Sequence, residues 1–132
     1  MKQKAFSNEW AHLYKEKINS NNEFKNLAVS WSDSLILETN EEKEKVGVLL
    51  VLKNGECTLA KIADQNDYDS TTYVINAKID VWRNLLEGKV DPVMAIMQKK
   101  LILVKGSLTN LLKYVNAAKE LLKTAKQIET YF

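Results

Sequence analysis

The chain of 132 residues has a single cysteine and no long hydrophobic run. Because Cys57 has no second cysteine to pair with, an internal disulfide is excluded, which fits a reducing compartment. The longest apolar run, Val46–Leu52, has the length of a strand and falls far short of the ~20 residues of a membrane span. The N-terminus has no apolar run of signal-peptide length after its lysines. We therefore expect a cytoplasmic protein with one domain over residues 1–132.

The side chains that enzymes and metal sites use are also scarce. The only histidine, His12, has no nearby partner for metal binding or base catalysis, so a structural role is expected. The run Asp64–Asp69 hints at a calcium loop, but Tyr68 and Asp69 stand where such a loop needs an oxygen ligand and a glycine. Phosphate-binding loops, dinucleotide fingerprints, zinc spacings and Ser/His/Asp arrangements are missing. We expect no enzyme, no metal and no cofactor.

A strong excess of one charge is missing as well. There are 19 Lys and Arg against 17 Asp and Glu, a formal net charge of +2, which does not favour a nucleic-acid partner. Charged residues make up 27% and hydrophobic residues 45%, an ordinary balance for a globular protein of this length with its own core.

The N-terminal third predicts two helices followed by a strand. Apolar residues from Phe6 to Ile18 recur at helical spacing after a capping Ser7, and the polar run Asn19–Asn22 ends that helix. A short second helix follows, whose apolar face consists of Phe24, Leu27, Ala28 and Trp31. The strand Ser34–Thr39 and a charged turn at Asn40–Lys45 come next.

The dipeptide Asn54-Gly55 between two apolar runs is the clearest local signal. It predicts a type I′ hairpin turn, because both central residues of that turn need a positive φ. The first arm, Val46–Leu52, is apolar on both faces and is expected inside the sheet, covered on both sides. After the second arm we expect a polar loop, Asp64–Ser70, and a fourth strand, Thr71–Ala77.

Two short helices and a strand are expected next. Val81, Trp82, Leu85 and Leu86 form one helical face before a C-terminal cap at Gly88. Asp91-Pro92 then begins a helix whose face consists of Val93, Met94, Ile96 and Met97. The fifth strand is Leu101–Val104, ended by Gly106. Because it follows a two-helix crossover, it can insert beside a distant strand, in parallel.

The last element is expected to be one long helix from about Ser107 to near the C-terminus. Its apolar positions cover about half of the helical wheel, more than the ~100° that contact with one core needs. Such a helix must therefore have a further role. It could close a cavity as a lid, lie wedged between two neighbours, or form a dimer interface. The whole order of elements predicts an α+β fold, with a five-stranded, mainly antiparallel sheet and helices on one face.

The run "WRNLLEGKVDPVMAIMQKKLILVKGSL" resembles the sterol carrier protein type 2 domain family. Gly88, Asp91-Pro92, Lys100-Leu101 and Gly106 fall where that family has its helix end, helix start, strand start and strand end. The run "LKNGECTLAKI" resembles the family's central hairpin, and Trp10 and Trp82 resemble aromatics of bacterial members. Lys99 stands where the family usually has glycine, and the strand before Gly106 is one residue longer.

The resemblance, which spans nearly the whole chain, implies an apolar tunnel between the sheet and the helices. Members of the family bind fatty acids, fatty acyl-CoA, phospholipids or sterols without catalysis. A stand-alone domain of this kind is similar to small prokaryotic members, so sterol is the less expected ligand. The implied partner is thus a lipid or fatty acyl ligand, with transient contact to a membrane surface, for a monomer or homodimer.

The expected tunnel wall combines the two short helices, the fifth strand and the last helix. Flexible methionine side chains suit ligands of varied shape, although plain core packing explains the same pattern. The residues expected to line the tunnel are Leu50, Trp82, Leu86, Met94, Met97, Leu101, Leu103, Leu108, Leu111, Leu112 and Val115. Lys99 and Lys100 are candidates for contact with an anionic headgroup.

Two other functions stay open from the sequence. An interaction or dimerisation module could keep the fold with a closed cavity, plugged by Met94, Met97 and Leu111 and marked by an apolar external patch. A small enzyme acting on an apolar substrate would need a buried polar pair facing the cavity, which the sequence does not provide.

Overall fold

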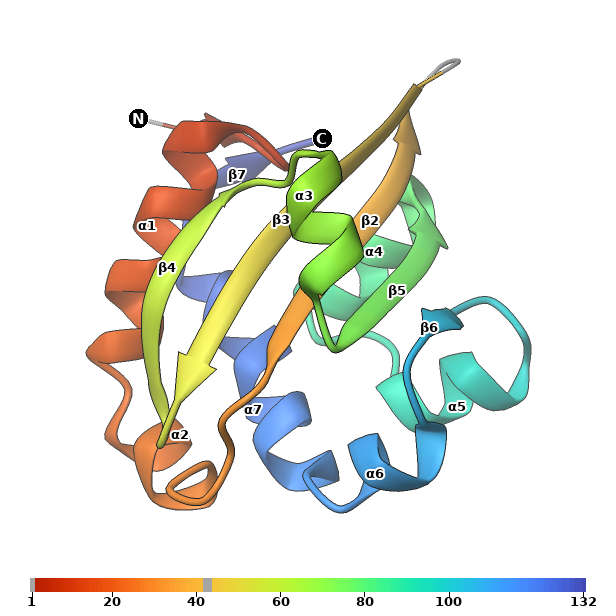
Figure 1. Ribbon diagram of the computed structural model, residues 1–132. Helices are drawn as coiled ribbons and strands as arrows, with labels where there is room; N and C mark the ends of the chain where they lie inside the picture. Colours follow the sequence, from red (N-terminus) through yellow and green to blue (C-terminus); the bar gives the residue numbers. More distant parts are fainter. Residues whose placement is uncertain (1, 42–43) are drawn as a thin grey trace.

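The computed structural model describes residues 2–41 and 44–132 (Figure 1). The turn expected within Asn40–Lys45 has its centre at residues 42–43, outside the described residues. The strands are β1 (Gln3–Lys4), β2 (Ser34–Glu41), β3 (Glu44–Lys53), β4 (Glu56–Ile62), β5 (Tyr73–Lys78), β6 (Ile102–Lys105) and β7 (Thr130–Tyr131). The helices are α1 (Asn8–Asn19), α2 (Asn22–Leu27), α3 (Gln65–Ser70), α4 (Ile79–Leu86), α5 (Pro92–Met97), α6 (Leu108–Leu112), α7 (Val115–Thr124) and the 3₁₀ turn η1 (Ala125–Gln127).

The main sheet has five strands in the order β4-β3-β2-β5-β6. All neighbours are antiparallel except β2 and β5, so the predicted α+β fold with a mainly antiparallel sheet is confirmed. The expectation that the fifth strand could insert in parallel was wrong. Strand β6 lies at the sheet edge, antiparallel to β5, and the parallel pair forms earlier because β3, β4 and α3 all intervene between β2 and β5.

The predicted hairpin is confirmed at the turn between β3 and β4. Asn54 has a φ of 51° and Gly55 a φ of 83°, the two positive values that a type I′ turn needs. Strand β3 lies inside the sheet and is buried on both faces: Leu50 belongs to the main core, and Leu49 packs with Ile36 on the other face.

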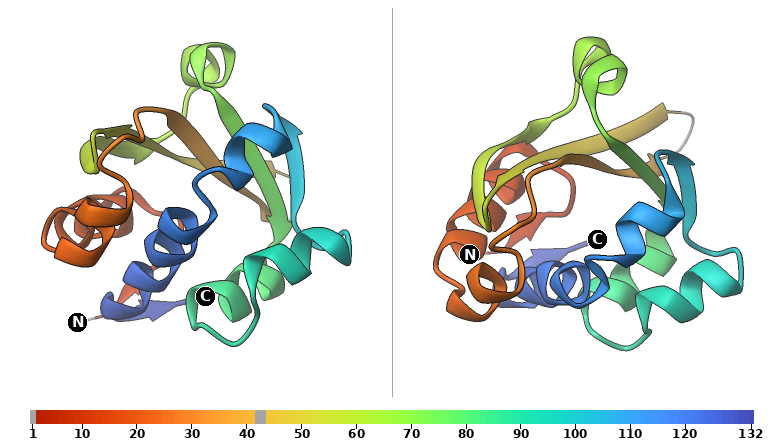
Figure 2. Two further views of the ribbon diagram at one scale, coloured as in Figure 1. Left: turned by 90° about the horizontal axis from the view of Figure 1, so that it is seen from below. Right: turned by 60° about the horizontal axis from the view of Figure 1, so that its bottom comes forward.

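Helix α3 replaces the loop expected at Asp64–Ser70. Asp64 and Asp67 form a capping box at its start, in which each side chain accepts a hydrogen bond from the other residue's backbone N–H. The aspartates that hinted at a calcium loop therefore begin a helix. In Figure 2 this helix lies across the sheet from the other helices, where it covers the face that carries Ile36.

The other helices cover the opposite face of the sheet (Figure 2). Helix α1 begins after Ser7, whose hydroxyl accepts a hydrogen bond from the Trp10 N–H, as predicted. Helix α2 ends at Leu27, earlier than expected, so Trp31 lies beyond it and stacks on the ring of Tyr114 with 5.2 Å between centroids. No helix of the described residues is long and apolar enough to cross a membrane.

The prediction of a single long C-terminal helix was wrong. The chain leaves the helical conformation at Tyr114, which separates α6 from α7 and lets the two helices point in different directions. The wide apolar arc is therefore shared between two helices that face the same interior. After η1 the chain ends in β7, which pairs in parallel with β1 to form a small second sheet.

Helices α4 and α5 end in the same hydrogen-bonded motif with different residues. Gly88 follows α4 with a φ of 76°, and its N–H and that of Lys89 bond to the carbonyls of Leu85 and Asn84. After α5, Lys99 has a φ of 61°, and its N–H and that of the next residue make the equivalent bonds. A lysine thus holds a left-handed position that glycine adopts more easily.

The substitution Lys99→Gly is expected to leave the free energy of unfolding unchanged or to raise it by up to about 1 kcal/mol. Relief of the left-handed strain slightly outweighs the greater freedom of glycine in the unfolded chain. Lys100→Gly is the matched control, because Lys100 is not among the positive-φ residues, and it should cost about 0.5–1 kcal/mol. Urea unfolding of both variants checks this, and equal losses would contradict it.

Candidate functional site

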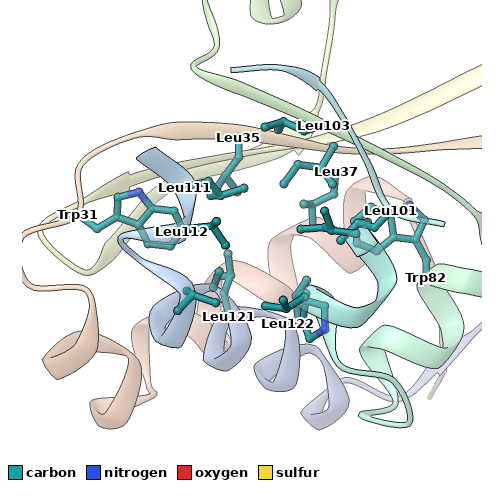
Figure 3. A pocket seen from close by; sticks show the side chains of 16 residues that line it. Trp31, Leu35, Leu37, Trp82, Leu101, Leu103, Leu111, Leu112, Leu121 and Leu122 are labelled. Atoms are coloured by element: carbon teal, nitrogen blue, oxygen red, sulfur yellow. The ribbon is translucent and has the colours of Figure 1, made fainter. Parts of the chain in front are cut away.

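An apolar cavity of about 60 Å³ lies between the main sheet and the helices that cover it (Figure 3). Its wall is drawn from the strands β2, β5 and β6, from the helices α4 to α7, and from two connecting segments. Every residue of the wall is apolar: Trp31, Leu35, Leu37, Ile75, Trp82, Pro92, Val93, Ile96, Leu101, Leu103, Leu111, Leu112, Val115, Ala118, Leu121 and Leu122.

The sheet side of the cavity is a row of side chains across three strands. Leu37 of β2 pairs with Ile75 of β5, which pairs with Leu103 of β6, so the three project from the same face. Leu35 lies two residues before Leu37 and points the same way (Figure 3). Strand pairing, rather than nearness in the sequence, brings these residues together.

Helix α7 forms the opposite side. Val115, Ala118 and Leu122 are spaced i, i+3 and i+7, which places them on one helical face. The helix is held by polar contacts on its other sides: the Tyr14 hydroxyl donates to the Leu121 carbonyl at 2.6 Å, and the Asn21 amide donates to the Thr124 hydroxyl at 2.8 Å. The cavity wall on α7 therefore belongs to a well-anchored helix.

Two tryptophans lie at opposite ends of the cavity (Figure 3). The indole N–H of Trp31 donates to the Asp33 carboxylate at 2.9 Å, and that of Trp82 donates to the Glu38 carbonyl at 2.8 Å. Because both N–H groups are already paired, neither offers a free donor to a ligand. The interior can therefore contribute apolar contact but very little polar recognition.

Leu112 of α6 is the most exposed residue of the cavity wall, and we take the mouth of the cavity to lie beside it, next to α5. Leu112 lines the cavity and is still 43% exposed, and Val93 and Ile96 of α5 are half-buried wall residues. Asp91 holds the start of α5: it accepts from the backbone N–H of Val93 and forms an ion pair with Lys119 of α7 at 3.3 Å. The backbone bond first, and then the lysine, keep the pKa of Asp91 below its usual range.

Six of the expected tunnel residues line the cavity, namely Trp82, Leu101, Leu103, Leu111, Leu112 and Val115. Leu50 and Leu86 are buried in the main core but do not reach the cavity. Contrary to the expectation, Met94, Met97 and Leu108 lie outside the cavity wall, where they are 48%, 72% and 39% exposed. Helix α5 has only six residues and turns Val93 and Ile96 inward, so the neighbouring methionines face away.

Sequence reasoning missed ten wall residues: Trp31, Leu35, Leu37, Ile75, Pro92, Val93, Ile96, Ala118, Leu121 and Leu122. Alternation along β2 could have grouped Leu35 with Leu37, and helical spacing could have added Ala118 and Leu122 to Val115. The headgroup candidates Lys99 and Lys100 follow α5 and are exposed outside the cavity wall.

The SCP-2 sterol transfer family model matches residues 12–119 of the chain. A crystal structure of sterol carrier protein 2 is 31% identical, with a TM-score of 0.86 over 95% of this chain and 99% of that one. The solution structure of a conserved hypothetical protein from Thermus thermophilus is 29% identical, with a TM-score of 0.86 over 99% and 94%. No curated protein sequence matched significantly. These similarities support lipid binding or transfer as the general function.

The solution structure of palmitated SCP2L2 from Aedes aegypti shares the fold alone. It is 11% identical, with a TM-score of 0.56 over 83% of this chain and 91% of that one.

The chain's one thiol lies outside the cavity wall. Cys57 is buried, and its Sγ donates to the Leu59 carbonyl at 3.3 Å. Burial raises the pKa of this thiol to about 11, so the thiolate that would act as a nucleophile is scarce at neutral pH. His12 is exposed on α1, and among residues 2–41 and 44–132 there is no cluster of three or more potential metal ligands.

Cys57 should react with a thiol reagent at pH 8 about 100-fold more slowly in the folded protein than in denaturant. Stability should also fall as the pH rises from about 8.5 to about 11, because only the unfolded state loses the thiol proton in that range. Denaturant titrations at several pH values, compared with Cys57→Ala, isolate this contribution. Fast native labelling, or the same pH slope in both proteins, would contradict the prediction.

Proposed function

Because the chain belongs to the SCP-2 sterol transfer family, we propose that it binds the acyl part of a lipid in the cavity and transfers that lipid. The ligands proposed are a fatty acid, a fatty acyl-CoA or a phospholipid, bound without catalysis. A sterol is less favoured, because a rigid ring system adapts less to a narrow cavity than a flexible chain does. A cytoplasmic location and a monomeric or dimeric state remain predictions from the sequence.

The observation that carries the proposal is the wholly apolar wall with both tryptophan N–H groups already paired. Each methylene group transferred from water to such a wall contributes about 0.8 kcal/mol. A carboxylate or phosphate has no partner inside and would be costly to bury, so the headgroup stays at the mouth. Lys99 and Lys100, just beyond the mouth-lining helix α5, are proposed to lie near it.

Entry of a chain requires the cavity to widen. Its volume of about 60 Å³ is below the roughly 300–1,000 Å³ typical of pockets for drug-sized ligands. Helices α5 and α6 make few close contacts with other elements, unlike α7, so they are the parts that can move at least cost. We therefore assign the opening of the cavity to the separation of α5 from α6.

The alternative, an interaction module with a plugged cavity, has weaker support. Two of the three residues expected to plug it, Met94 and Met97, point away from the cavity. Catalysis on an apolar substrate also lacks support, because the wall contains no side chain that could act as an acid, a base or a nucleophile.

Native mass spectrometry of gently purified protein, followed by organic extraction, should find a fatty acid or phospholipid bound.

Titration with a fluorescent fatty acid should give saturable binding that Val115→Phe weakens by at least tenfold, because the larger ring fills the cavity. Val29→Phe is the matched control, since Val29 is 63% exposed and off the cavity wall. A ligand-free mass that stays unchanged with added acyl chains and acyl-CoA would overturn the proposal.

Tryptophan fluorescence tests whether the ligand occupies this cavity. Trp31 and Trp82 line it, whereas Trp10 is buried outside it. Fatty acid should change the emission of Trp10→Phe as strongly as that of the wild type. In the variant Trp31→Phe, which keeps the bond from Trp82 to Glu38, the change should be smaller while binding measured by the fluorescent ligand persists. A change that follows Trp10 alone would place the ligand elsewhere.

A further inference from the structure

The lysines of residues 92–113, which we call the mouth segment, are not balanced by acidic residues. The segment contains Lys99, Lys100, Lys105 and Lys113 and no Asp or Glu. The remaining residues contain 15 Lys and Arg against 17 Asp and Glu, a formal charge of −2. The small net charge of the chain therefore conceals a segment with a charge of +4.

These lysines are also available to an external anion. Among the described residues, no ion pair involves Lys99, Lys100 or Lys113, and all three are exposed. Lys105 differs, because its ammonium group donates to the carbonyls of Tyr68 and Asp69 at the end of α3.

The mouth segment also holds a disproportionate share of the exposed apolar side chains. Eleven large apolar residues are exposed among the described residues, and six of them fall in these 22 positions. They are Met94, Met97, Ile102, Val104, Leu108 and Leu112. Apolar side chains interspersed with unpaired lysines are the composition of surfaces that settle into the headgroup region of an anionic bilayer.

The segment lies at the exposed side of the cavity. Helix α5, strand β6 and helix α6 lie together at one end of the molecule, beyond β5 (Figures 1 and 2). Val93, Ile96 and Leu112 of the same segment line the cavity, while Met94 and Met97 face outward. A surface that holds lipid headgroups here would place them beside the mouth.

We propose that the mouth segment docks on membranes rich in anionic phospholipid, with Lys99, Lys100 and Lys113 against the phosphates and Met94, Met97 and Leu112 among the upper acyl carbons. The proposal rests on the proposed function, which supplies the reason for a lipid source at the mouth. A second copy of the chain is a poorer occupant, because a symmetric contact through this segment would bring two charges of +4 together.

The test is flotation of the purified protein with vesicles of phosphatidylcholine, with or without phosphatidylglycerol. We expect at least tenfold stronger binding to the anionic vesicles, and weaker binding as the salt concentration rises. Lys99→Gln/Lys100→Gln should weaken that binding by about tenfold or more. Lys123→Gln/Lys126→Gln removes the same charge from exposed positions outside the segment and should change it less than threefold.

A second pair of variants tests the apolar part of the surface. Met97→Gln should weaken vesicle binding several-fold, because this side chain is 72% exposed and would lose its place among the acyl carbons. Leu59→Gln is the matched control on β4, where Leu59 is an exposed apolar residue outside the segment. Thermal unfolding of each variant shows that it is folded.

A vesicle-free titration with fluorescent fatty acid separates this proposal from the proposed function. Normal fatty acid binding by Met97→Gln, whose side chain lies outside the cavity wall, together with weakened vesicle binding, supports docking by the mouth segment. Fatty acid binding by a wild type that ignores anionic vesicles, or vesicle binding that is lost equally in both lysine pairs, overturns docking and leaves ligand binding intact. Vesicle binding without fatty acid binding supports docking and overturns ligand binding in the cavity. A concentration-dependent dimer that Met97→Gln disrupts would also overturn docking, in favour of self-association.

Discussion

The hydrogen bond from the Trp82 indole to the Glu38 carbonyl joins the helical layer to the centre of the sheet. Glu38 lies on β2, the middle strand, and its buried carboxylate accepts from the Tyr68 hydroxyl and the Asn76 amide on the opposite face. One residue of β2 thus holds α4 below the sheet through its backbone and α3 above it through its side chain. The Trp82 bond is buried and the Tyr68 bond is partly buried, so loss of the Trp82 N–H would cost more than loss of the Tyr68 hydroxyl.

The cavity follows from how the two layers are supported. Helix α7 is fixed at some distance from the sheet by α1 and α2 on one side, through Tyr14 and Asn21, and the sheet is fixed at the other end by Trp82. Between these supports the facing side chains are mainly leucines and an alanine, which do not fill the gap. The space lies beneath β2, β5 and β6, which supply Leu37, Ile75 and Leu103 to its wall.

Features set by a few neighbouring residues could be predicted, and features set by distant partners could not. The Ser7 cap, the Asn54-Gly55 turn and the Asp91-Pro92 helix start are each encoded locally, and all three are confirmed. The break at Tyr114 accompanies a stacking contact with Trp31, which is far away in the sequence, and no local signal marks it. Likewise Ile75 lies in the cavity wall because β5 pairs in parallel with β2. The methionines of α5 lie outside the wall because only the other half of the helix's apolar face packs against the interior.

Helix α5 carries apolar side chains on two sides: Met94 and Met97 face outward, and Val93 and Ile96 face the cavity. A helix of six residues with apolar groups on both sides cannot bury all of them against one core, so part of its surface faces water at a cost. That cost is removed when the exposed side contacts acyl chains. Contacts with the acyl chains then compete with the contacts that hold α5 and α6 against the rest of the molecule. If the mouth segment docks as proposed, docking and opening act on the same short helices, α5 and α6. The proposed widening of the cavity then takes place where an acyl chain is available to fill it.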